Sequence, residues 1–204
     1  MVLFELFSGQ ARNSIEVSAR FPDRDRAGKP WLNLIRGDFK GVVLPVRFEV
    51  VDGSTYTDLI ATRNSGLFLI SDRMVQTLSK AQLSGWSQFP IDLIDAAGKP
   101  VTGFSGLSIL GRSGPIDLTK SEIVYKSVVP GAPMAKYFKG KFIDIQEWDG
   151  SDFFLPAGYH GTFMSEKAAT VLTQSDLSNL HIRNLADAEV PEFTARILEK
   201  SKRG

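Results

Sequence analysis

The sequence predicts an α+β protein in which mixed, mostly antiparallel sheets pack against a few helices. Short β-branched and apolar segments recur between turn-forming residues, which is typical of strands joined by loops. Three other segments space their apolar residues three or four apart, as an amphipathic helix does. A hydrophobic content of 43%, with 14 Phe among 204 residues, supplies enough apolar side chains for a folded core.

The predicted strands are short, and turn residues bound most of them. They cover residues 1–7, 41–51, 67–70, 86–94, 103–110, 122–129, 141–146 and 180–185. Asp52 and Gly53 form a strong turn signal after the second of these strands. Residues 8–30 combine Gly, Pro and alternating charges, so they are predicted as an exposed loop.

Helices are predicted over residues 71–83, 165–174 and 192–200, where apolar residues recur at helical spacing. Ser71 and Ser165 are suited to cap the first two helices, and each is followed by an acidic residue that suits the positive helix end.

The first two helices resemble each other at an offset of 94 residues, and the similarity extends into the apolar residues that precede them. Two interpretations stay open. The chain contains a duplicated strand-helix-strand unit, or two capped amphipathic helices share features that any such helices have. We therefore expect a single domain over 1–204 or two related lobes at about 1–110 and 111–204.

Composition excludes several classes of function. The absence of cysteine removes disulfides and sulfur ligands, and a reducing, cytoplasmic location is the simplest expectation. The net charge of +1 comes from 24 basic and 23 acidic residues, so nucleic acid is not expected as a partner. No apolar stretch approaches the roughly 18 residues that a membrane helix needs, so no membrane association is expected.

Motifs for catalysis and for cofactor binding are missing. The two histidines, His160 and His181, have no second histidine within helical reach, and phosphate-binding glycine loops are absent. We expect no catalytic residue, no cofactor and no metal site. The alternatives are a hydrolase or transferase that uses Asp149 and Asp152, with His160 or Asp117, between the two halves, and a structural homo-oligomer.

The most distinctive string runs from Trp148 to Phe154, where two aspartates flank a Gly-Ser turn between large aromatic residues. One interpretation is an Asx turn in which Asp149 caps backbone N–H groups while the aromatic residues enter the core. The other is an exposed interface loop, because aromatic anchors dominate many binding energies. On this second interpretation the partner-binding residues are Trp148, Asp149, Asp152 and Phe153.

Several short motifs between residues 55 and 190 carry a family resemblance: Leu69-Ile70-Ser71-Asp72-Arg73, Leu83-Ser84-Gly85-Trp86, Gly114-Pro115-Ile116-Asp117-Leu118-Thr119-Lys120-Ser121-Glu122, Trp148-Asp149-Gly150-Ser151-Asp152-Phe153-Phe154 and Phe163-Met164-Ser165-Glu166-Lys167. With them the chain resembles a bacterial family, with a myxobacterial type member, that was first described as a domain of unknown function. Its members were later assigned as immunity proteins of polymorphic-toxin systems. The resemblance implies a cytoplasmic protein that binds and silences a cognate toxin without catalysing a reaction.

Overall fold

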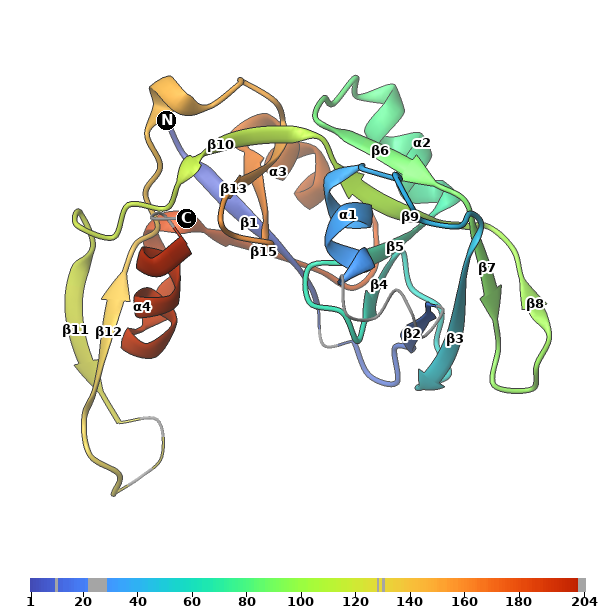
Figure 1. The fold of residues 1–204 in the computed structure, drawn as a ribbon, viewed down its shortest axis with the longest axis horizontal. Helices are drawn as coiled ribbons and strands as arrows, with labels where there is room; N and C mark the ends of the chain where they lie inside the picture. The colour runs from blue at the N-terminus through green and yellow to red at the C-terminus, as the bar shows by residue number, and fades with distance from the viewer. Residues whose placement is uncertain (10, 22–28, 128, 130, 202–204) are drawn as a thin grey trace.

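The computed structural model describes residues 1–9, 11–21, 29–127, 129 and 131–201 (Figure 1). Within these ranges the chain forms four α-helices and sixteen strands, mostly in antiparallel pairs, so the predicted α+β class is confirmed. The helices are α1 (Pro30–Arg36), α2 (Asp72–Lys80), α3 (Glu166–Gln174) and α4 (Glu192–Ser201). None of these described helices has the length and apolar character needed to cross a membrane.

The strands form three sheets. One contains β2 (Glu16–Arg20), β3 (Val46–Asp52), β4 (Leu59–Thr62), β5 (Phe68–Ser71), β6 (Trp86–Phe89), β7 (Ile91–Ile94), β8 (Pro100–Val101) and β9 (Phe104–Ile109), in the order β6-β9-β5-β4-β2-β3-β7-β8. The second contains β1 (Leu3–Ser8), β10 (Gly111–Pro115), β13 (Phe153–Ala157), β14 (Thr162–Ser165) and β15 (Leu180–Asn184), in the order β10-β13-β14-β1-β15. The third contains β11 (Glu122–Lys126), β12 (Ala135–Lys139) and β16 (Glu189–Pro191), in the order β11-β12-β16.

The internal similarity of the sequence is present in the structure as a repeated unit. Strands β5 and β6 and helix α2 begin 94 residues before their counterparts β14, β15 and α3. The five-stranded order β10-β13-β14-β1-β15 matches the part β2-β4-β5-β9-β6 of the larger sheet, strand for strand. In matching registers, Ser71 lies opposite Phe104, and Ser165 lies opposite Leu3.

Strand β1 lies in the sheet of the second unit, where it takes the place that β9 has in the first. Strands β5 and β6 of the first unit pair with β9, whereas β14 and β15 of the second unit pair with β1, from the start of the chain. Apart from β1, the larger sheet uses residues before 110 and the other two sheets use residues from 111 onward. The larger apolar core nevertheless includes buried residues from both units, such as Met74 and Met164. The division into one domain or two lobes stays a prediction.

The local signals for the two repeated helices are confirmed. The Ser71 and Ser165 side chains accept hydrogen bonds from the backbone N–H groups of Met74 (3.1 Å) and Ala168 (3.2 Å), three residues into each helix. The apolar stripe of α2 buries Met74 and Leu78, and the stripe of α3 buries Ala168 and Leu172. Each helix therefore packs through the face that its sequence period predicts.

Several parts of the chain differ from the sequence-based expectation. Strands β4, β10, β12, β13 and β16 were not predicted. Residues 8–30 were predicted as loop, but β2 lies there, between β3 and β4, while residues 22–28 lie outside the described residues. Helix α1 was not expected; Pro30 begins it and suits the first helical turn. Residues 141–146 form no strand, because Asp144 accepts the N–H of Gln146 and turns the backbone into a 3-10 helix over Ile145–Glu147.

Candidate functional site

The loop that the sequence analysis selected lies just before β13. The Asp149 carboxylate accepts hydrogen bonds from the backbone N–H groups of Arg112 (2.7 Å) and Ser151 (2.9 Å). Burial by itself would raise the pKa of Asp149, but hydrogen bonds from Ser151 and Arg112 and the Arg112 charge outweigh burial, and the pKa is lowered. The carboxylate thus closes a turn against β10, as the Asx-turn interpretation expects.

The aromatic residues of this loop face inward. Phe153 is fully buried in the larger core, Phe154 is fully buried in the smaller one, and the half-buried Trp148 ring lies 5.2 Å from the Phe154 ring. Of the four residues predicted to contact a partner, Asp152 and Phe153 are buried. Partner binding by this loop stays a prediction, and in this structure only Asp149 and part of Trp148 are accessible for it.

Asp152 connects the two repeated units. Its carboxylate accepts hydrogen bonds from the backbone N–H of Ser84 (2.9 Å) and the hydroxyl of Ser165 (2.7 Å), and Lys167 Nζ lies 3.4 Å away. Partial burial would raise the pKa of Asp152, but the bonds from Ser84 and Ser165 and the Lys167 charge lower it overall. The carboxylate joins the end of the first unit to the cap of α3.

Asp58 makes the same connection in the opposite direction, 94 residues earlier in the chain. It accepts hydrogen bonds from the Ser71 hydroxyl (2.6 Å), the Ser178 backbone N–H (2.7 Å) and Arg73 Nη2 (2.6 Å). These bonds outweigh the effect of burial and hold the pKa of Asp58 far below its usual value. In each unit, one aspartate therefore binds the capping serine of its own helix and also a serine of the other unit.

A buried charge cluster, which the sequence analysis missed, lies in the second unit. Glu5 is completely buried, and its carboxylate is 2.6 Å from Lys141 Nζ, 2.6 Å from the Tyr159 hydroxyl and 3.2 Å from Arg183 Nη2. The Tyr159 hydroxyl donates to Glu5 and accepts from Lys141 at 2.8 Å. Burial lowers the pKa of Lys141, and burial together with the Glu5 charge raises the pKa of Tyr159.

The repeat shows that this cluster replaces apolar packing. In the first unit the positions that match Glu5 and Arg183 are Gly106 and Phe89, and the Phe89 ring fills the space beside the glycine. The available signal was a charged residue inside the apolar stretch from Leu3 to Phe7, because a carboxylate in a buried strand requires a partner. The sequence could not identify that partner, because Lys141 is more than a hundred residues away.

A cavity of about 500 Å³ lies between the units and α4. His160 lines it with Tyr159 and Ile197, and the His160 Nδ1 atom has no hydrogen-bond partner among the described residues. Burial, with the positive charges of Arg36 and Lys29, lowers the pKa of His160.

The aspartates of the proposed hydrolase or transferase do not reach this cavity. Asp149 and Asp152 are bound as described above, and Asp117 accepts hydrogen bonds from the backbone N–H and hydroxyl of Thr119. The structure does not bring these groups together with His160. In the described part of the chain, no group of three or more His, Asp or Glu side chains is placed to hold a metal ion.

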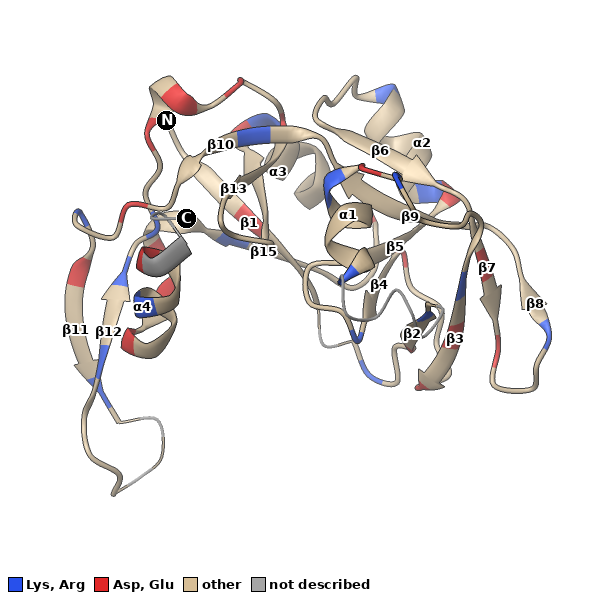
Figure 2. Ribbon diagram, viewed as in Figure 1, with Lys and Arg blue, Asp and Glu red and all other residues tan. Residues whose placement is uncertain are grey.

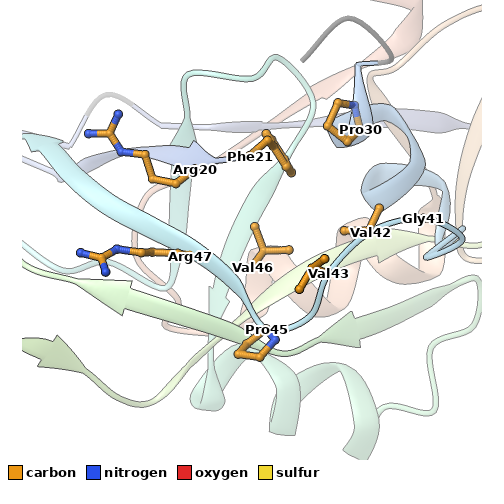
Figure 3. Close-up of a pocket in the computed structure, with 9 residues that line it drawn as sticks. All are labelled: Arg20, Phe21, Pro30, Gly41, Val42, Val43, Pro45, Val46 and Arg47. Atoms are coloured by element: carbon orange, nitrogen blue, oxygen red, sulfur yellow. The ribbon is translucent and has the colours of Figure 1, made fainter. Parts of the chain in front are cut away.

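A shallow groove of about 180 Å³ lies between β2, β3 and the start of α1 (Figure 3). Phe21 and Val46 contribute apolar surface, and the Arg20 and Arg47 side chains extend from adjacent strands at one end. Both guanidinium groups bind Glu49, with Nε to carboxylate distances of 2.7 Å and 3.0 Å, and the Arg20 hydrogen bond is the main cause of the lowered pKa of Glu49. These arginines therefore already have an anionic partner.

Exposed apolar side chains mark a different surface. We use the term α4 surface for Phe193 and Ile197, which are 75% and 51% exposed, together with the adjoining cavity. The two residues are four positions apart and so lie on the same side of the helix. Ala195 and Leu198 of the same helix are buried in the smaller core. Helix α4 therefore has apolar residues on its packed side and on its exposed side.

Charge does not single out any face of the molecule. Figure 2 shows basic and acidic positions interspersed over the sheets and helices, in keeping with the net charge of +1. Comparison of the sequence with protein-family models and with curated proteins gave no match.

Proposed function

We propose that this protein is a non-catalytic protein-binding module of the immunity type, which acts in the cytoplasm by covering the active surface of a cognate toxin. The α4 surface is the observation that carries the proposal. Phe193, a large aromatic side chain on a helix, is 75% exposed and packs little against the described part of its own chain. Such residues are typical anchors of protein interfaces.

The surroundings of the α4 surface suit a protein interface. Ile197 lies at the edge of the 500 Å³ cavity, which offers space for an apolar side chain of a partner. Glu192 and Arg196 form an exposed ion pair at 3.3 Å on the same helix, and they supply polar groups around the apolar pair. An apolar centre with a polar rim is the usual anatomy of a specific interface.

The placement of the reactive side chains is compatible with a function based on surface contact. Asp58, Asp152 and Glu5 are occupied in contacts that hold the fold together. A protein that occludes its partner requires no reactive group of its own. The family resemblance described above leads to the same proposal.

Co-expression with the product of the neighbouring gene tests the proposal. We expect the neighbour to be toxic alone, and we expect this protein to bind it and restore growth. Phe193→Ser should weaken binding by about 2 kcal/mol, or roughly thirtyfold, if Phe193 is an interface anchor. Val43→Ser is the matched control, because Val43 is 69% exposed and lies outside the α4 surface.

Two results would contradict the proposal. One is a neighbouring product that is not toxic, or that is toxic but neither bound nor neutralised. The other is equal neutralisation by the Phe193→Ser and wild-type proteins at limiting concentration, which would remove the α4 surface from the interface.

A further inference from the structure

The outer edge of the three-stranded sheet is open. Among the described residues β11 pairs with β12 alone, and Figure 1 shows it at the rim of the molecule with no other segment beyond it. An open edge presents unpaired backbone N–H and C=O groups to a further strand. Ile123 and Tyr125 are 51% and 61% exposed on this same strand.

The pairing with β12 determines which backbone groups point outward. Gly140 donates its N–H toward the β16 side, to the carbonyl of Ala188. Because a trans peptide directs its C=O opposite to its N–H, the carbonyl of Lys139 points toward β11, where Glu122 lies opposite. Backbone direction alternates along a strand, so the N–H and C=O groups of Ile123 and Tyr125 face the open edge.

The sequence of β11, Glu-Ile-Val-Tyr-Lys, is complementary to itself when two copies run antiparallel about Val124. In that register Ile123 of one copy lies opposite Tyr125 of the other, and their outward backbone groups form hydrogen-bonded pairs. Glu122 lies opposite Lys126 at both ends. We propose that β11 is a dimerisation strand that joins two copies of this chain into one continuous six-stranded sheet.

Side-chain chemistry favours a second copy over an unrelated strand. Each Ile123 and Tyr125 pair places a β-branched residue beside an aromatic ring, which is a stabilising cross-strand combination. Each Glu122 meets a lysine, and like charges never face each other in this register. Lys126 binds Glu189 of β16 within its own chain, on the side of β11 away from the open edge, so pairing with Glu122 of the second copy requires this side chain to change its partner.

The contact is small, since one five-residue strand from each copy supplies it. Stable complexes bury about 800 Å² on each partner, so the dimer should be weak and should dissociate on dilution. The inference does not rest on the proposed function, because it uses β11 and leaves the α4 surface free for a toxin.

Disulfide trapping in the full chain tests the register, and the absence of native cysteine makes each introduced thiol unique. In the proposed dimer the two Val124 positions form a non-hydrogen-bonded pair with Cα atoms about 4.5 Å apart, which a disulfide can bridge. Val124→Cys should therefore form a covalent dimer under mild oxidation. Ser127→Cys is the control, because this exposed residue follows β11 and its two copies would lie roughly 20 Å apart, which is too far for a disulfide.

Charge reversal supplies a second test by sedimentation over a dilution series. Glu122→Lys and Lys126→Glu should each raise the dissociation constant at least tenfold, because like charges then face each other. An equimolar mixture of the two variants should recover dimers, since each lysine again meets a glutamate. Far-UV circular dichroism verifies that each variant is folded.

The proposal is overturned if the wild-type protein stays monomeric at every concentration, or if Val124→Cys oxidises to dimer no faster than Ser127→Cys. A dimer that Glu122→Lys leaves unchanged would overturn it as well, because a different surface would then be responsible. Association of β11 with a strand of another protein, without self-association, is likewise a negative result.

Discussion

Asp58 and Asp152 offer a direct measurement of how strongly the two units hold each other. Asp58→Ala removes the acceptor for Ser71, Arg73 and Ser178, and Asp152→Ala removes the acceptor for the matching residues of the other unit. In both variants a backbone N–H at a unit boundary loses its partner. Because the two sites are related by the internal repeat, each variant is a control for the other.

The magnitudes follow from the contacts. A hydrogen bond to a charged group contributes about 1.5 to 3 kcal/mol, but neighbouring bonds are not additive. Arg73 is 53% exposed, so its ion pair with Asp58 adds at most about 1 kcal/mol. We expect Asp58→Ala to lower the free energy of unfolding by about 3 to 4 kcal/mol. Asp152→Ala should cost about 2 to 3 kcal/mol, because Lys167 is more distant, at 3.4 Å.

Urea denaturation of both variants and of the wild type at pH 7 measures these differences. A loss below about 0.5 kcal/mol in both single variants would refute the reasoning, because the carboxylates would then not hold the units together. A larger loss for Asp152→Ala than for Asp58→Ala would refute the ranking that we derive from the Arg73 and Lys167 distances.

The pH dependence provides an independent check with Asp58→Asn, which keeps the side-chain shape. The pKa of Asp58 is lower in the folded protein than in the unfolded chain. Its carboxylate therefore stabilises the fold above the unfolded value of about 3.9, and this contribution is lost as the pH falls toward the folded value. Between about pH 4 and pH 2 the stability of Asp58→Asn should fall less steeply than that of the wild type.

Three further variants test other parts of the structure. Glu5→Ala should cost about 3 to 5 kcal/mol in urea denaturation, because it leaves buried Lys141 without its counter-charge; a loss below about 1 kcal/mol would contradict this. Gly85→Ala should destabilise the protein by about 2 to 3 kcal/mol, because the backbone has φ 80° and the added Cβ would lie 2.1 Å from a backbone oxygen. Gly98 has the same φ but lies in open space, so Gly98→Ala should cost about 1 kcal/mol. Equal losses of stability in the two variants would contradict the argument. Ser108→Ala should lower the thermal midpoint by several degrees, because it removes the buried hydroxyl that donates to Leu34 in α1, and an unchanged midpoint would show that α1 needs no such link.

Local patterns in the sequence predicted much of the fold. The capped helices at Ser71 and Ser165 form as expected, because capping and helical period act over a few residues. The sequence analysis selected Asp149 and Asp152 as candidate partner-binding residues, whereas in the structure Asp152 is buried and holds the two units together. Strand β2 was missed, because five residues in a turn-rich segment give too short a pattern.

Thus the sequence by itself determined the α+β class, the boundaries of three of the four described helices to within a few residues and the internal similarity at an offset of 94. Only the tertiary structure decided that β1 joins the sheet of the second unit, that Glu5 meets Lys141, and that β11 is left at an open edge. The physical reason is the distance along the chain between the residues that interact. Helix caps and periods depend on neighbours in the chain, whereas strand pairing and buried charge pairs depend on residues that come together only when the whole chain has folded.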